Sequence, residues 1–215
     1  GDVVKPTSST SRIQDAISEL VRDKTTLDIG CVQHSAHHHE SDTWLHAHLV
    51  RSAASVIGVD IAGREVEELR HKGYRMVCAD ALTVDLGDTF DVITAGEIIE
   101  HLDDPGIFLR NMNRHLKDDG MLILTTPNVF FAFHFVESLT TSPYRRWNPE
   151  HVAWYCYFTL ENLLLRNGFY VDQCVYFTRS RKLRRILQSL RLGCASFLAS
   201  TLVVVAKKRR SSHAD

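Results

Sequence analysis

The sequence is poor in the features that mark membrane, secreted and nucleic-acid-binding proteins. Its apolar runs fall well short of the ~20 residues that a membrane-spanning helix needs, and its first residues lack the apolar core of a signal peptide. The five cysteines are odd in number and lie mostly inside apolar runs, which argues against a disulfide framework. The formal net charge of −1 gives no field that would draw the chain to nucleic acid or to a membrane. These absences predict a cytoplasmic globular protein without a transmembrane segment.

The order of apolar and polar residues predicts an α/β fold. With 215 residues, the chain is long enough for a single domain with a large core. Strand-like runs are expected at residues 26–29, 56–60, 75–79, 90–95, 121–126, 169–177 and 200–206. Helices are expected from a cap at residues 9–11 to residue 21, and at 43–54, 64–72, 102 or 105 to 116, and 159–167. This alternation predicts a doubly wound, mostly parallel sheet with helices on both faces.

Four segments fall outside this alternation. Residues 1–10 are expected to form a flexible lead-in, and residues 207–215 a disordered tail. Residues 128–158 are rich in aromatic side chains and have the length of a lid over an acceptor pocket, although these aromatics also suit a core or a homodimer contact. Residues 179–195 are basic and amphipathic, and are expected to cover the sheet. Weak contact of this segment with an anionic membrane surface is left open.

Two of the strand-like runs carry a carboxylate at or near their ends. Asp28 and Gly30 close the run at residues 26–29, and Asp60 closes the run at residues 56–60. Parallel strands bring such residues to one carboxyl edge, where open α/β sheets bind nucleotides. A carboxylate at the end of the second strand is placed there to accept hydrogen bonds from ribose hydroxyls. The sequence therefore predicts a nucleotide-type site at this edge.

Several short motifs occur along the chain in a characteristic order and spacing. They are Leu27-Asp28-Ile29-Gly30-Cys31, Gly58-Val59-Asp60, Cys78-Ala79-Asp80-Ala81, Phe90-Asp91-Val92-Ile93, Glu97-Ile98-Ile99-Glu100-His101-Leu102, Gly120-Met121-Leu122-Ile123-Leu124-Thr125-Thr126-Pro127-Asn128, and Phe158-Thr159-Leu160 followed by Gly168-Phe169. Together they resemble the class I S-adenosylmethionine-dependent methyltransferases. This resemblance implies a Rossmann-like sheet of seven strands with the last strand antiparallel, and S-adenosylmethionine as the cofactor.

The resemblance also implies which residues contact the cofactor. Gly30, with Cys31 beside it, would let the backbone approach the amino-acid end of the cofactor. Asp28 would orient this loop or the cofactor's amino group. Asp60 would bind the ribose hydroxyls, with Ile61 against the adenine. The remaining implied contacts are to the adenine and the sulfonium, from Asp80, Ala81, Ala95 and Gly96.

The first loop departs from the family pattern. The family usually has alternating glycines at the positions of Gly30, Val32 and His34, and only Gly30 is a glycine here. Glycines at such positions allow unusual backbone angles and close ligand approach. Two interpretations follow: the loop is a variant that still binds the cofactor, or the cofactor site is degenerate.

A second cluster follows the fourth predicted strand. If this segment is helical, Glu97, Glu100 and His101 share one face. With the later His151 they would hold a divalent metal such as Mg²⁺, which would lower the pKa of an acceptor hydroxyl. This pattern resembles the metal sites of relatives that methylate small-molecule hydroxyls or the terminal 2′-hydroxyl of small RNAs. The alternatives are a metal-free general base, from His101 or His151 with Glu97 nearby, and a purely structural role.

The favoured function is S-adenosylmethionine-dependent O-methylation of a small-molecule or sugar/polysaccharide hydroxyl, with metal assistance left open. RNA 2′-O-methylation is the second enzymatic hypothesis. Nucleic acid is the less favoured partner because the net charge is slightly negative and RNA binding relies on phosphate contacts. The third hypothesis is a non-catalytic binding module with a degenerate cofactor loop.

Overall fold

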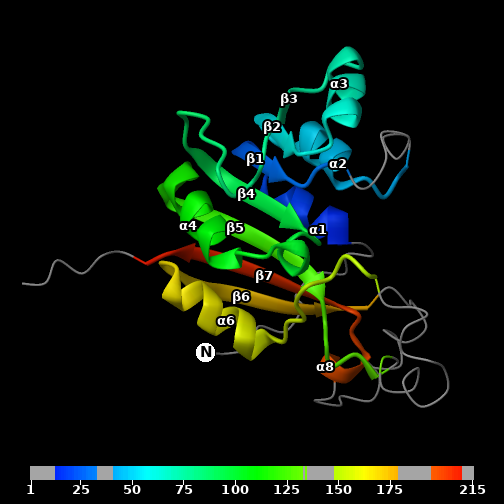
Figure 1. Ribbon diagram of the computed structural model, residues 1–215, viewed down its shortest axis with the longest axis vertical. Coiled ribbons are helices and arrows are strands. Elements are labelled where there is room, and N and C mark those ends of the chain that lie inside the picture. The colour runs from blue at the N-terminus through cyan, green and yellow to red at the C-terminus, as the bar shows by residue number, and fades with distance from the viewer. Residues whose placement is uncertain (1–12, 33–40, 133, 135–147, 179–194, 210–215) are drawn as a thin grey trace, which may run out of the picture.

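The computed structural model describes residues 13–32, 41–132, 134, 148–178 and 195–209. A seven-stranded sheet in the order β3-β2-β1-β4-β5-β7-β6 forms its centre (Figure 1). The strands are β1 Thr25–Ile29, β2 Ser55–Asp60, β3 Met76–Cys78, β4 Phe90–Gly96, β5 Leu116–Pro127, β6 Phe169–Phe177 and β7 Thr201–Lys208. Only β7 runs antiparallel to its two neighbours within this sheet. The predicted doubly wound sheet with an antiparallel last strand is confirmed.

Helices cover both faces of the sheet. They are α1 Ile13–Leu20, α2 Leu45–Ser52, α3 Gly63–His71, α4 Pro105–His115, α6 Tyr157–Arg166 and α8 Ala195–Leu198, with the short 3-10 helix η2 at Ile99–His101. In Figure 1, α4 and α6 lie in front of the sheet and α1 lies behind it. Gly73 and Gly168, which follow α3 and α6, have φ angles of +92° and +86°, the left-handed conformation that ends helices.

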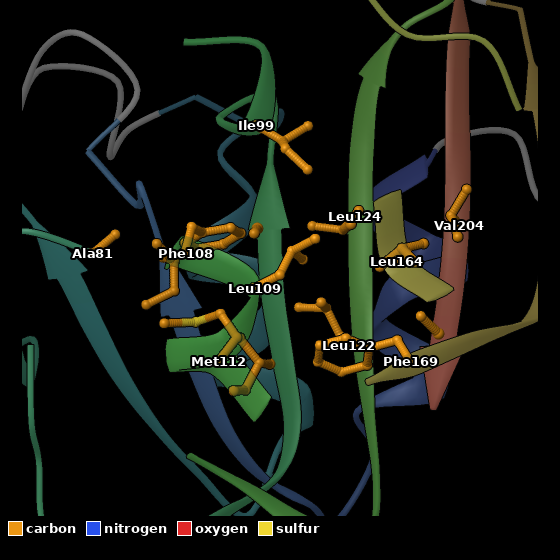
Figure 2. Packing of buried hydrophobic residues seen from close by; sticks show 14 of the residues in the cluster. Ala81, Ile99, Phe108, Leu109, Met112, Leu122, Leu124, Leu164, Phe169 and Val204 are labelled. Atoms are coloured by element: carbon orange, nitrogen blue, oxygen red, sulfur yellow. The ribbon is translucent and has the colours of Figure 1, made fainter. Parts of the chain in front are cut away.

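The core on the α4 and α6 side is the largest apolar cluster. Figure 2 shows Phe108, Leu109 and Met112 of α4 packed over β4 and β5, with Leu164 of α6 beside Phe169. Ile17 and Val21 pack with side chains from the opposite face of the sheet. Strand residues alternate between these two layers, because successive side chains of a strand point to opposite faces. The alternation fixes which residues of β1 and β4 lie behind the sheet.

Strand β5 begins earlier than the sequence suggests. The predicted strand starts at residue 121, whereas β5 follows directly from α4 at Leu116. Its pairing with β4 is irregular between Phe90 and Val92. A Cβ at Gly120 would lie 3.0 Å from the carbonyl oxygen of Lys117 and 3.1 Å from that of Asp91. Gly120 therefore permits a close backbone approach inside the strand.

The C-terminal strand also extends further than expected. Lys207 and Lys208 belong to β7, and Lys207 forms an ion pair with Asp172 at 3.0 Å. The predicted disordered tail is therefore wrong for these two residues.

The lead-in at residues 1–10 and nearly all of the basic segment at residues 179–195 lie outside the described residues. In the part of the chain that is described, no helix is long and apolar enough to cross a membrane.

Candidate functional site at the carboxyl edge of the sheet

The turn after β1 requires a glycine. Gly30 has a φ of +70°, and its amide donates a 2.9 Å hydrogen bond to the carbonyl of Val59 on β2. A Cβ at this position would lie 3.0 Å from Cδ1 of Ile98. Both the backbone angle and the contact with Ile98 favour glycine. The turn brings the end of β1 next to the segment that follows β4.

Two side chains fix the loop beyond this turn. Asp60 Oδ2 accepts a hydrogen bond from the amide of Val32 at 2.9 Å. Trp44 Nε1 donates one to the carbonyl of Cys31 at 2.7 Å. The Val32 side chain is only 2% exposed and packs in a cluster with Trp44 and Val66. The valine side chain therefore points into the protein interior. Although it replaces a glycine of the family pattern, it does not occupy the space above the loop. His34 lies outside the described residues.

Asp28 lies behind the turn. The residue is 2% exposed; one of its carboxylate oxygens accepts a hydrogen bond from Thr94 Oγ1 at 2.6 Å, and the other bonds to His46 Nδ1 at 2.9 Å. Asp28 is therefore enclosed by Thr94 of β4 and His46 of α2. His46 was not singled out from the sequence, since a histidine in a helix reads as polar, yet it is 1% exposed.

The other residues assigned to the cofactor fall into two groups. Ile61 is 74% exposed, and Asp80 is exposed with its Oδ1 accepting the amide of Leu82 at 2.8 Å. Their side chains face solvent at the edge of the sheet. Ala81 and Ala95 are buried in the main apolar cluster, so their methyl groups pack inward. Any contact these alanines make at the edge would come from their backbone.

The condition under which Glu97, Glu100 and His101 would share one helical face is not met, because Glu97 lies outside the short helix η2. Glu97 has a φ of +53°, and its amide donates to the carbonyl of Thr125 on β5 at 2.9 Å. Pairing with β5 therefore continues to the end of β4, and the chain turns sharply at Glu97 before η2 begins. As a result, Glu97 is exposed and does not share a helical face with Glu100.

Glu100, His101 and His151 come together after this turn. One ligand-type atom from each lies within 4.8 Å of the other two. Glu100 is 1% exposed; its Oε2 accepts from Thr126 Oγ1 at 2.9 Å, and its Oε1 has no partner among the described residues. His101 Nδ1 lies 3.1 Å from the carbonyl of Glu150, which leaves its Nε2 for other contacts. The unpaired carboxylate oxygen points to a site for a ligand or proton.

The environment shifts the titration of two of these groups. Burial raises the pKa of the Glu100 carboxyl to about 7, and the charge of Glu97 adds to the increase. Burial and the neighbouring His101 lower the pKa of His151. Near neutral pH, the Glu100 carboxyl can therefore gain or lose a proton, while His151 is neutral. Both properties suit groups that accept a proton.

A short series of ring side chains from the predicted lid extends from this cluster. The ring of His151 lies 5.4 Å from that of Trp154, which in turn lies 5.1 Å from that of His134. The amides of Val152 and Ala153 donate to the carbonyl of Glu100 at 2.9 and 3.2 Å. The chain at Val152 and Ala153 is thus held beside Glu100. Composition marked this stretch as aromatic, but only the fold brings Trp154 and His134 to the cluster.

Known proteins match both the sequence and the fold. The family described as "Methyltransferase domain" matches residues 8–174. A ubiquinone biosynthesis O-methyltransferase of Bartonella quintana (strain Toulouse) is 29% identical over 135 residues, which cover 57% of this chain and 54% of that protein. The chain therefore spans about half the length of this relative.

Solved structures with low sequence identity share the fold. A SAM-dependent methyltransferase from Archaeoglobus fulgidus has a TM-score of 0.64 at 19% identity, with 92% of each chain covered. The magnesium protoporphyrin IX methyltransferase of Synechocystis PCC 6803, solved with bound SAH, has a TM-score of 0.64 at 12% identity. That match covers 93% of this chain and 83% of the Synechocystis protein.

Proposed function

Because the chain belongs to the methyltransferase domain family, we propose that it transfers a methyl group from S-adenosylmethionine to a hydroxyl of a small molecule. The observation that carries this proposal is the junction between the two clusters at the sheet edge. Ile98 packs against the Gly30 turn, and the unpaired oxygen of Glu100 lies two residues further along the chain. A cofactor on the Gly30 turn would therefore lie beside groups that can receive a proton.

The cofactor would occupy the edge formed by β1, β2 and β4. We propose that the Gly30 turn accommodates its amino-acid end and that Asp60 accepts from its ribose hydroxyls, with the exposed Ile61 beside the adenine. Asp80 would accept from the adenine amino group. Methyl transfer is an in-line displacement, so the main contribution of these contacts is to position the methyl group.

The acceptor hydroxyl must lose its proton as it is methylated. His101, His151 and Glu100 are the candidates to receive it, and Glu97 lies near enough to influence the charge of Glu100. The lowered pKa of His151 keeps its imidazole neutral at pH 7 and so able to accept. Trp154 and His134 would then pack against the acceptor, an arrangement that favours a small molecule with a planar or sugar ring.

The same residues fit a bound metal ion in part. Glu100 offers a buried carboxylate oxygen without a partner, and His101 and His151 offer imidazole nitrogens within 4.8 Å of it. Two imidazoles and one carboxylate suit Mn²⁺, Fe²⁺ or Zn²⁺ better than Mg²⁺, which prefers oxygen ligands. Glu97 does not join this set, so we propose the three other residues as ligands. Such an ion, when bound, would lower the pKa of the acceptor hydroxyl.

The proposed acceptors are hydroxyl-bearing small molecules, a class that includes sugars. The relative from Bartonella is named for O-methylation in ubiquinone biosynthesis, which favours a small molecule over RNA. The cytoplasmic location and the homodimer stay predictions from the sequence.

The first experiment is a calorimetric titration with S-adenosylhomocysteine, the demethylated product of the cofactor. We expect micromolar binding; no binding at millimolar ligand would contradict the proposal. Transfer of a labelled methyl group is then measured on phenols, catechols and sugars. Each acceptor is tested with chelator and after adding back Mn²⁺, Zn²⁺ or Mg²⁺.

Variants separate the metal from the base. His101→Ala and His151→Ala should each remove most activity while leaving S-adenosylhomocysteine binding unchanged. His71→Ala, on the exposed side of α3, is the matched control and should stay active. Activity that survives chelation in the wild type but falls in both variants supports a metal-free base. Activity that survives in both variants would contradict the assignment of this cluster.

A further inference from the structure

We propose that His46 is a positioning residue that holds the loop after β1, at Gly30–Val32, in the conformation that binds the cofactor. This inference rests on the proposed function, because it assigns a role in cofactor binding to a side chain that does not reach the cofactor. The start of α2 and the residue before it are hydrogen-bonded to the chain on both sides of Gly30.

The first tie precedes the turn. His46 Nδ1 lies 2.9 Å from Asp28 Oδ2, and Thr94 Oγ1 donates to the other oxygen of Asp28 at 2.6 Å. Asp28 pairs in register with Thr94 on β4 and with Gly58 on β2. The carboxylate is thus held from the neighbouring strand and from the helix behind it. Since the pair is almost fully buried, water cannot replace either hydrogen bond if a partner is removed.

The second tie follows the turn. Trp44, which immediately precedes α2, donates to the carbonyl of Cys31 at 2.7 Å, and its ring centroid lies 5.3 Å from that of His46. The start of one helix therefore holds both Asp28, before Gly30, and Cys31, after it. A glycine-rich loop can adapt its backbone when a ligand binds. The loop of this chain is instead held in place before binding, which lowers the ordering cost that binding would otherwise carry.

The space for His46 is created by Gly58. A Cβ at Gly58 would lie 2.8 Å from Cε1 of the His46 ring and 2.8 Å from Cys31 Sγ. The ring therefore fills the volume that any larger residue at this position of β2 would take. In this position the ring directs Nδ1 at Asp28.

A buried metal is the competing explanation for this cluster. Ligand-type atoms of Asp28, Cys31 and His46 lie within 4.8 Å of one another, and His46 Nε2 has no partner among the described residues. Asp28, however, already makes a hydrogen bond with each oxygen, to Thr94 and to His46. This arrangement favours a hydrogen-bonded support over a coordination site.

The experiment compares His46→Leu with His46→Asn. The leucine cannot bond to Asp28, whereas the side-chain amide of asparagine can place an NH₂ donor close to the position of Nδ1. Affinity for S-adenosylhomocysteine is measured by calorimetry well below the melting temperature of every variant. We expect His46→Leu to weaken binding by about tenfold, which corresponds to about 1.4 kcal/mol, and His46→Asn to restore most of it.

Val21→Ala controls for general loss of stability. Val21 is buried beside α1, in a cluster that does not include the loop. It should lower the melting temperature without changing affinity. Affinity loss in Val21→Ala equal to that in His46→Leu would overturn the proposal, as would unchanged affinity in His46→Leu. Stoichiometric bound metal that is lost in His46→Leu would also overturn it, in favour of the coordination site.

Hydrogen exchange separates this inference from the proposed function. Amide exchange is followed in the ligand-free proteins at Gly30 and Val32, whose amides donate to Val59 and Asp60. Faster exchange at these amides in His46→Leu, but not in His46→Asn or Val21→Ala, supports the positioning role even if S-adenosylhomocysteine does not bind. Equal exchange in all four proteins would overturn it.

Discussion

Asp60 Oδ2 accepts the amide hydrogen of Val32 at 2.9 Å, so the carboxylate at the end of β2 holds the loop that follows β1. Its second oxygen accepts the amide of Ala62 at 3.0 Å and thereby shapes the chain that leads into α3. One side chain thus joins the two strand ends that would receive the cofactor's amino-acid and ribose groups. Its contribution to binding combines direct contact with support of the loop.

Replacement of Asp60 tests both contributions. Asp60→Ala should weaken S-adenosylhomocysteine binding by at least tenfold, since a hydrogen bond to a charged group contributes about 1.5–3 kcal/mol. Asp60→Asn keeps an oxygen that can accept from Val32 and should lose less affinity. Calorimetry measures the difference, with the exposed Glu67→Ala on α3 as control. Equal affinity in Asp60→Ala and wild type would show that this edge does not bind the ribose.

The strands and the turn were predictable because their signals are local. Apolar runs that end in Asp28-Ile29-Gly30 and in Val59-Asp60 mark strand ends whatever the rest of the chain does. The bounds that shifted depend on tertiary contacts. The start of β5 at Leu116 reflects irregular pairing with β4, and the turn at Glu97 reflects continued pairing with Thr125. Neither contact leaves a local pattern in the sequence.

The candidate site was predictable only in part for the same reason. Glu100, His101 and His151 were grouped by motif, and the fold does bring them together. The helical face that was to include Glu97 was inferred from spacing alone, which carries no information on backbone pairing. The buried contact between His46 and Asp28 could not be predicted, because the two residues are 18 positions apart and burial of a histidine leaves no periodic signal in the sequence.

Gly58→Ala should destabilise the fold. The added Cβ would lie 2.7 Å from Met76 Sδ and 2.8 Å from the His46 ring, closer than real Cβ contacts. Overpacking of this kind costs about 1–3 kcal/mol. Urea denaturation measures the loss, and Gly63→Ala provides the control, because its Cβ would meet only Cys78 Sγ at 3.3 Å. If Gly58→Ala is as stable as Gly63→Ala, the space next to His46 is larger than the structure indicates.

Glu100 should make stability fall as pH rises from about 4 to about 7. Its pKa is raised to about 7 by burial, against an ordinary value of about 4.3 in the unfolded chain. In this window the folded protein keeps a proton that the unfolded chain has lost, so increasing pH favours unfolding. The full effect is about 4 kcal/mol, and Glu100→Gln should remove it.

Urea denaturation of wild type and Glu100→Gln at pH 4.5, 6 and 7.5 measures this difference. The variant should gain stability relative to wild type as pH rises, since glutamine stays neutral and can still accept from Thr126. A difference that stays constant across the three pH values would mean that Glu100 is ionised in the folded protein. The same outcome would weaken its assignment as a group that exchanges protons near neutrality.

Asp91 lies near the start of β4, at the opposite end of this strand from Glu100. Its contribution to stability should have the opposite pH dependence, because Asp91 is bound as an anion. Burial alone would raise its pKa, but Lys117 Nζ at 2.8 Å and the amide and hydroxyl of Thr25 at 2.8 and 2.6 Å lower it to about 2. The unfolded value is about 3.9, so the folded protein is stabilised above pH 4. This contribution disappears as the pH falls towards 2.

Asp91→Asn should therefore cost about 2 kcal/mol at pH 7 and much less at pH 2.5, as measured by urea denaturation. The exposed Asp88→Asn should change stability little at either pH. An equal cost of Asp91→Asn at both values would show that its hydrogen bonds, rather than its charge, tie β1 to β4 and β5.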